Sequence, residues 1–458
     1  MRDLPSIRKI AFLCGLAWLG LGTLIAPAEP VPGVNVSPFG AQTVWPNDPN
    51  LTTILNRMQE AGIQWARFDL CWWGLCESTP GEYNFTPSYS GSTWDTDGAI
   101  QMLHDRGIEP FPILCYGNPL YDNGQGPFSE AGRQAYGNFC HAAAERYKNS
   151  VTYWEIWNEP NLEFFWGRAP NAVDYAQLAQ VAAGRIREGN PQAIVAGGVT
   201  SGIDLGFLQT AFDNGLLDAV DAITIHPYRI AAPESIAGEV STIRSMIAAR
   251  TSRSIAVWTG EWGYNTYWSE VSEKGQAKCL SRMMTGNLAM GIDLSIWFST
   301  HAFVEISGSD HDAEWGLLDY DFTPRPSFYA MRTLNQRLPA PVHSVADPLG
   351  VTLSPSLSNQ RIEVFERGMP EQLTVAIWLA RWPLSDSFAG ETTTVRLQVP
   401  EGTTAAAYDG LDGDAIQLTE QRQGDRLELR NFRVMDYPVF VEVALPAPST
   451  TQANWHLK

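Results

Sequence analysis

The chain alternates short apolar runs with amphipathic helical segments from residue 34 to residue 338. We predict eight strands, near residues 36–42, 64–70, 109–114, 151–157, 193–198, 219–225, 255–259 and 294–299. Helical patterns lie between them, for example over residues 131–147, 173–187, 239–249, 272–290 and, last, 326–337. Eight strand–helix repeats in about 300 residues are typical of a (β/α)8 barrel. The alternative, an open doubly wound sheet, is disfavoured because no glycine-rich nucleotide loop follows the first strand.

The pattern changes after the proline-rich residues 338–341. Alternating or β-branched runs follow without a helical period, near residues 351–353, 361–365, 373–379, 393–399, 427–429 and 440–443. This pattern predicts a smaller β-sandwich domain over residues 339–446. We expect residues 447–458 to form a tail.

The first 28 residues have the features of a signal peptide. Arg8 and Lys9 precede an apolar stretch from Ile10 to Ile25, and the small residues Ala26 and Ala28 fit a cleavage site. An uncleaved membrane anchor is the alternative, but the apolar stretch is short for a membrane span. We therefore expect cleavage after residue 28, a secreted or periplasmic protein, and no stable membrane insertion.

The net charge of the chain and the spacing of its possible metal ligands restrict which kinds of binding partner we expect. The formal net charge of −19 disfavours nucleic acids and anionic membranes. The seven histidines are dispersed and the cysteines lack metal-ligand spacing, so we predict no metal and no cofactor. A disulfide from Cys71 to Cys76 or to Cys115, and free thiols, all remain open. No pattern indicates an oligomeric state.

Two predicted strands end in a glutamate flanked by aromatic residues. Residues 154–160 read WEIWNEP, which places Glu159 after the fourth strand, and residues 257–264 read VWTGEWGY, which places Glu261 after the seventh. The carboxyl ends of barrel strands meet at one face, so both side chains are expected in one site. A retaining glycosidase needs two carboxyl groups about 5 Å apart.

The fourth-strand motif, continued by NLEFFW at residues 161–166, resembles the acid/base strand of the clan A retaining glycoside hydrolases, most of all family 39. The resemblance covers residues 34–338 in full and 339–446 in outline. It implies double displacement at β-glycosidic bonds of an oligo- or polysaccharide, with Glu159 as acid/base and Glu261 as nucleophile. A β-xylosidase and an endo-acting enzyme on exopolysaccharide both fit family 39, and the neighbouring families 5, 30 and 51 share the two strand ends.

The resemblance also implies supporting roles. Asn158 would hydrogen-bond the sugar 2-hydroxyl, and Arg67 on the second strand would support the nucleophile electrostatically. His226 and Tyr228, after the sixth strand, would face the site, with Tyr228 donating a hydrogen bond to Glu261. The alternative for Arg67 and His226 is a structural role in an ion pair or in the core.

Tryptophans gather at the predicted strand ends, among the seventeen of the chain. Their indoles can stack on the C–H faces of sugar rings, and core packing is the alternative for each. The candidate platforms are Trp72, Trp73, Trp166, Trp262 and Trp297. The resemblance implies that Trp297 lies at the bottom of the subsite that binds the cleaved sugar.

Another class of function uses the same barrel. A catalytically inactive carbohydrate-binding surface protein would be favoured by a blocked site, or by carboxyl groups much farther apart than about 6 Å. Transglycosylation would use the same residues as hydrolysis. Exo and endo action both remain open.

Overall fold

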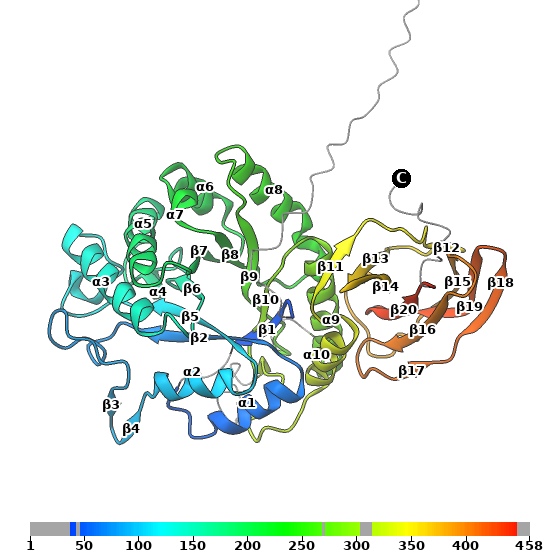
Figure 1. The fold of residues 1–458 in the computed structure, drawn as a ribbon, viewed down its shortest axis with the longest axis horizontal. Coiled ribbons are helices and arrows are strands. Elements are labelled where there is room, and N and C mark those ends of the chain that lie inside the picture. The colour runs from blue at the N-terminus through cyan, green and yellow to red at the C-terminus, as the bar shows by residue number, and fades with distance from the viewer. Residues whose placement is uncertain (1–36, 43–45, 268–270, 303–313, 447–458) are drawn as a thin grey trace, which may run out of the picture.

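The computed structural model describes residues 37–42, 46–267, 271–302 and 314–446 (Figure 1). The predicted signal peptide and the predicted tail lie outside the described residues. None of the helices in the described ranges has the length and apolar character needed to cross a membrane.

Eight parallel strands close into a barrel in the larger part of the molecule (Figure 1). Around the barrel they are β1 (Phe39–Gln42), β2 (Trp65–Cys71), β5 (Glu109–Cys115), β6 (Tyr153–Ile156), β7 (Ile194–Ser201), β8 (Ala222–His226), β9 (Ala256–Trp262) and β10 (Ser295–Trp297). β10 pairs with β1 and closes the ring. The predicted barrel is confirmed, and each predicted strand overlaps an observed one.

Helices surround the barrel. They are α1 (Leu51–Glu60), α2 (Thr96–His104), α3 (Glu130–Arg146), α4 (Glu163–Trp166), α5 (Ala172–Gly189), α6 (Leu205–Asp213), α7 (Leu216–Ala219), α8 (Ala237–Ala248), α9 (Glu273–Ala289), α10 (Pro326–Arg337), and the 3-10 turns η1 (Asp122–Gly124) and η2 (Pro233–Ile236). A small hairpin, β3 (Ser88–Tyr89) and β4 (Ser92–Thr93), lies between β2 and α2. Side-chain caps define where helices begin: the Ser129 hydroxyl accepts from the Gly132 N–H at the start of α3.

The barrel interior has an apolar floor and a polar layer above it. In the floor, Trp65 packs edge to face on Tyr153 at 4.6 Å, and Phe111 packs on Trp258 at 5.9 Å. Two residues further along their strands, the inward positions carry Arg67 and Glu155, both fully buried. Because the apolar floor is closed to water, these charged groups need partners within the protein. The carboxyl ends of the strands form the open face of the barrel.

The C-terminal part is a sandwich of two antiparallel sheets (Figure 1). One sheet contains β11 (Val342–Val345), β13 (Gln360–Arg367), β14 (Met369–Leu379), β20 (Val439–Ala444), β16 (Thr404–Asp409) and β17 (Ala415–Ile416); the other contains β12 (Thr352–Ser354), β15 (Glu391–Gln398), β19 (Arg426–Val434) and β18 (Thr419–Gln423). The predicted sandwich is confirmed. Strands β11, β16, β17 and β18 were missed because they are short, alanine-rich or polar and so lack an apolar alternation.

The sandwich packs on α9 and α10 and extends the apolar core of the barrel (Figure 1). α9 is buried on nearly every side, including Lys278, whose ammonium lies 2.8 Å from the buried carboxylate of Asp436 in the sandwich. On its other side, the Asn287 amide donates to the hydroxyls of Thr259 on β9 and Ser295 on β10. One helix therefore connects the sandwich to two barrel strands.

We expect Lys278→Ala to lower the free energy of unfolding by about 3–5 kcal/mol, because Asp436 would stay buried without its cation. Urea denaturation followed by tryptophan fluorescence measures the change. The double variant Lys278→Ala/Asp436→Ala should recover part of the loss, since it leaves no unpaired charge. A double variant as unstable as the sum of both single variants would contradict this explanation.

Candidate active site

The chain turns sharply at the end of β6, and this turn presents Glu159 to the barrel mouth. Trp157 and Glu159 both have left-handed backbone conformations, with φ of 68° and 44°. Each costs roughly 1–3 kcal/mol for a residue other than glycine and needs support from its surroundings. The support comes from the fully buried Trp157 ring, from the Trp157 N–H to the Leu114 carbonyl at 3.0 Å, and from the Leu162 N–H to the Glu159 carbonyl at 3.0 Å.

Glu159 and Glu261 face each other in this mouth. A carboxylate oxygen of each and a ring nitrogen of His226 all lie within 4.8 Å of one another. Retaining glycosidases place their carboxyl groups about 5–5.5 Å apart, whereas inverting enzymes separate them by roughly 6.5–9.5 Å to admit a water molecule. The spacing therefore matches direct attack by a carboxylate on a sugar bound between the two groups.

The two carboxyl groups have different surroundings. Burial raises the pKa of Glu159 to about 7, although a hydrogen bond with Ser201 and the charge of Arg67 act against the shift. Glu261 receives donors on both oxygens: the Tyr228 hydroxyl donates to Oε1 and the Arg67 Nη1 to Oε2, each at 2.7 Å. Glu159 is thus suited to carry a proton near neutral pH, and both oxygens of Glu261 are held in place by hydrogen-bond donors.

Arg67 connects most of the polar groups in the barrel. Its guanidinium donates to Glu261, to Glu155 at 2.7 Å, to Gln42 Oε1 at 2.9 Å and to Asn158 Oδ1 at 3.0 Å. Burial alone would lower the pKa of Arg67, but the neighbouring carboxylates raise it above its usual range, so the side chain stays cationic. Its predicted position beside Glu261 is the position that the structure shows.

His226 lies between Glu159 and Arg67. Its Nε2 is 3.3 Å from the Arg67 Nη2, and its Nδ1 is 3.0 Å from Glu159 Oε1. A guanidinium only donates hydrogen bonds, so Nε2 accepts, and the proton of the neutral ring is on Nδ1. Burial lowers the pKa of His226 to about 4, which keeps the ring neutral. His226 therefore donates to Oε1 of Glu159 as a neutral ring.

Glu155 and Gly260, which lie beneath the two glutamates, were not predicted from the sequence. Glu155 is fully buried, with Oε2 at 2.6 Å from the Arg67 Nη2, and its Oε1 has no hydrogen-bond partner among the described residues. A β-carbon on Gly260 would lie 2.8 Å from that Oε1 and 3.3 Å from His226 Nε2. The one available signal was a charged residue in the middle of the apolar run 151–157.

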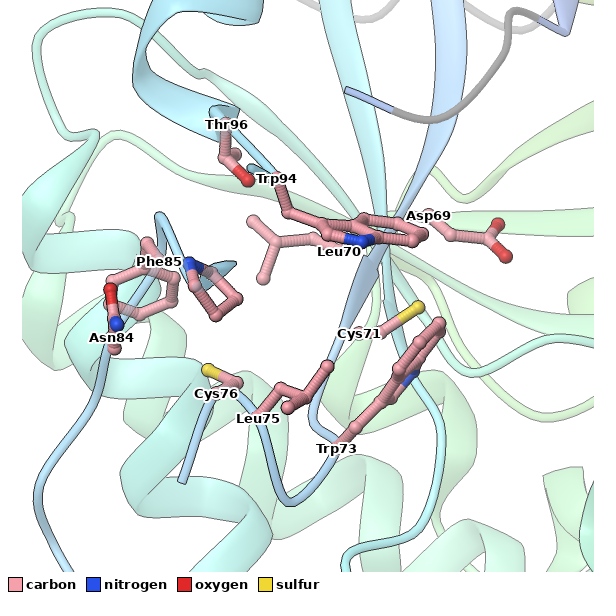
Figure 2. A pocket seen from close by; sticks show the side chains of 11 residues that line it. Asp69, Leu70, Cys71, Trp73, Leu75, Cys76, Asn84, Phe85, Trp94 and Thr96 are labelled. Carbon is pink, nitrogen blue, oxygen red and sulfur yellow. The ribbon is translucent and has the colours of Figure 1, made fainter. Parts of the chain in front are cut away.

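A cleft opens beside the site, between the end of β2 and residues 73–96 (Figure 2). Asp69 lies at its edge with the carboxylate turned away from the apolar walls. Burial raises the pKa of Asp69 to about 7, against the opposing charge of Arg67. Trp73 and Trp94, both partly exposed, line the cleft and pack edge to face at 5.0 Å. Trp73 is thus the predicted platform that offers a surface to a ligand.

The prediction of sugar platforms is wrong for the other four tryptophans, which are fully buried: Trp72, Trp166, Trp262 and Trp297. Trp166 packs edge to face on Trp157 at 5.1 Å, Trp262 packs beside Tyr264 at 5.9 Å, and the Trp297 indole donates to the Trp315 carbonyl at 3.2 Å. Their rings fill the space around the strand ends, so no face is left for a sugar.

The cysteines and the acidic groups of the mouth are poor metal ligands. Cys71 and Cys115 pair in register on β2 and β5, with Sγ atoms 3.9 Å apart, and both are free thiols, as are Cys76, Cys140 and Cys279. Burial raises the pKa of both the Cys71 and Cys115 thiols, which disfavours the thiolate that a metal needs. The Arg67 guanidinium lies beside Glu261 and His226, so the positive charge that a metal ion would bring to these groups is already present.

Comparisons with known proteins agree with this geometry. A family model described as cellulase (glycosyl hydrolase family 5) matches residues 29–301. The chain is similar to a family 39 glycoside hydrolase from the gut symbiont Bacteroides cellulosilyticus, with 20% identity and a TM-score of 0.70 over 90% of this chain and 81% of that one. It is also similar to a monomeric β-xylosidase from Caulobacter crescentus, with 14% identity and a TM-score of 0.62 over 91% of this chain and 97% of that one. A family 30 subfamily 8 xylanase from Clostridium acetobutylicum matches with 12% identity and a TM-score of 0.62 over 90% of this chain and 96% of that one. At these identities the solved structures show a shared fold.

We expect Gly260→Ala to lower the free energy of unfolding by about 1–3 kcal/mol, because the added methyl group would press on Glu155 and its neighbours in a closed layer. Chemical denaturation measures the change. Gly238→Ala on α8 is the matched control, since a β-carbon there meets no atom within 4 Å. Similar stability of both variants would show that the polar layer adapts to the extra atom.

Proposed function

The chain belongs to the cellulase family, glycosyl hydrolase family 5, and is a retaining glycosidase of clan A; we propose that it cleaves β-glycosidic bonds of an oligo- or polysaccharide with Glu159 as acid/base and Glu261 as nucleophile. The prediction of clan A is confirmed, and the likeness to family 39 is found in the fold. The proposal rests on one observation above all: two carboxyl groups within 4.8 Å that have opposite surroundings.

In the first step, a Glu261 oxygen attacks the anomeric carbon while Glu159 passes its proton to the departing glycosidic oxygen. His226 donates to Glu159 Oε1, which favours Oε2 as the oxygen that carries the proton. Asn158 Oδ1 accepts from Arg67, which leaves its amide N–H groups to donate to the sugar 2-hydroxyl. The products are a glycosyl ester on Glu261 and a free leaving group.

In the second step, Glu159 acts as the base. Esterification removes the negative charge of Glu261, and Glu159 is then an ionised carboxylate that can take a proton from water. The water attacks the anomeric carbon, the ester bond breaks, and Glu261 leaves as a carboxylate. Arg67 and Tyr228 again hydrogen-bond both of its oxygens. A sugar hydroxyl in place of water would give transglycosylation.

The substrate is proposed to be a β-linked chain of neutral sugars. Two structurally similar proteins are a β-xylosidase and a xylanase, so β-xylosides are the first substrates to test. The buried carboxylates of Glu155 and Asp69, and the net charge of −19, disfavour a uronic acid at the site. An exopolysaccharide or an exo-acting β-xylosidase reaction is consistent with the same residues.

We also propose that the protein is exported. This part rests on the sequence alone: the basic residues 8–9, the apolar residues 10–25 and the small residues at positions 26 and 28. Mass spectrometry of the mature N-terminus after expression in a secreting host tests it. An N-terminus after residue 28 would support the proposal, and an intact residue 1 on cell-associated protein would contradict it.

We expect Glu261→Gln to lower kcat/KM on aryl β-glycosides by at least roughly a thousandfold, about 4 kcal/mol of transition-state stabilisation. Glu159→Gln should cause a similar loss on substrates with poor leaving groups and a much smaller loss of the first step on dinitrophenyl glycosides, which need no proton. Glu163→Gln, an exposed carboxylate on the following turn, is the control. Equal rates for wild type and Glu261→Gln would remove Glu261 from the mechanism. Saturable glycan binding without turnover would favour the inactive binding protein.

We expect kcat/KM to fall as pH rises through about 7, because only the protonated form of Glu159 can act as the acid. His226, whose pKa lies near 4, stays neutral in this range, and Arg67 stays charged. Asp69 titrates in the same window, so pH–rate profiles of wild type and Asp69→Asn should be compared. Retention of the descending limb in Asp69→Asn assigns it to Glu159; loss of the limb would assign it to Asp69.

A further inference from the structure

Three aromatic rings, Tyr116, Phe165 and Phe164, form a row that leads from the active site to the surface. The Tyr116 and Phe165 rings stack at 5.9 Å and 15°, and Phe164 packs edge to face on Phe165 at 4.9 Å. At the inner end, the Tyr116 hydroxyl hydrogen-bonds Asp69 beside the reacting groups. At the outer end, Phe164 is 86% exposed. The row is therefore continuous with the site and open to solvent.

The row lies on the side of the site where the leaving group must be. Phe164 and Phe165 belong to α4, which begins four residues after Glu159, and the Leu162 N–H donates to the Glu159 carbonyl. An acid that protonates the glycosidic oxygen has to sit beside the departing part of the substrate. Residues on the same turn as Glu159 are consequently nearest to that part.

The row is held in a fixed position. The last residue of α4, Trp166, is fully buried, and its carbonyl accepts from the Gly126 N–H at 2.7 Å, which joins α4 to the loop after β5. Ten large apolar side chains are exposed in the described part of the chain, and four of them lie on these two joined segments: Leu120, Phe128, Leu162 and Phe164. Leu162 and Phe164 are therefore exposed apolar side chains on the same turn as Glu159.

We propose that the row of Tyr116, Phe165 and Phe164 binds the leaving-group part of the substrate by stacking on its sugar rings. Pyranose rings present apolar C–H faces that pack against aromatic rings, and a neutral sugar suits a surface without a cationic side chain in the row. This inference rests on the proposed function and adds to it. The substrate continues past the cleaved bond as a sugar chain, and the same surface holds an acceptor sugar in transglycosylation.

The test compares two substrates that share the transferred sugar: the β-glycosyl fluoride, whose leaving group is one atom, and the linear β-linked trisaccharide. We expect Phe164→Ala to lower the ratio of kcat/KM on the trisaccharide to that on the fluoride by about tenfold. Phe164→Trp should keep or raise this ratio. Tyr329→Ala, which removes a partly exposed aromatic ring from α10, should leave the ratio as in wild type.

Two results would overturn the inference in different ways. An unchanged ratio in Phe164→Ala, with the wild type hydrolysing both substrates, would show that the row does not bind the leaving group while the proposed function stands. Failure of the wild type to hydrolyse the β-glycosyl fluoride and the β-linked trisaccharide of every sugar tested would contradict the proposed function, and the inference would fall with it.

Discussion

One buried guanidinium, that of Arg67, is the interaction on which the rest of the site depends. Above the apolar floor of the barrel, water cannot reach Glu155, so the carboxylate is tolerated only because Arg67 lies 2.6 Å away. The same guanidinium donates to Glu261, to Asn158 and to Gln42, each carried by a different strand or strand end. Fixing one cation therefore fixes several functional side chains relative to one another, as catalysis requires.

Two glutamates can perform opposite tasks in this protein because the fold gives them different neighbours. Glu159 stands on a strained turn, largely buried, with one neutral histidine donating to it. Glu261 lies near the end of β9, where the register against β10 shifts, and it accepts hydrogen bonds from a cation and a phenol. Desolvation therefore raises the pKa of Glu159 to about 7, whereas both oxygens of Glu261 accept hydrogen bonds. This division suits a proton donor beside a nucleophile.

The sandwich supports the site from a distance through α9. This helix is closed between the sandwich and the barrel, where its buried Lys278 pairs with Asp436. Its Asn287 hydrogen-bonds Thr259 on β9, two residues before Glu261. The sandwich therefore shields the helix that supports the strand of the nucleophile, a structural role that needs no glycan contact.

The sequence by itself determined the elements and the two principal carboxylates. Strand and helix periods are local, and Glu159 and Glu261 each follow an apolar strand-length run, so topology alone brings them to one face. Tertiary structure decided which tryptophans are exposed, because burial depends on rings from distant segments, as for Trp166 on Trp157. It also decided the partner of Glu155 and the raised pKa of Glu159 and Asp69. Partners and solvent access arise from contacts between strands far apart in the chain, which no local pattern records.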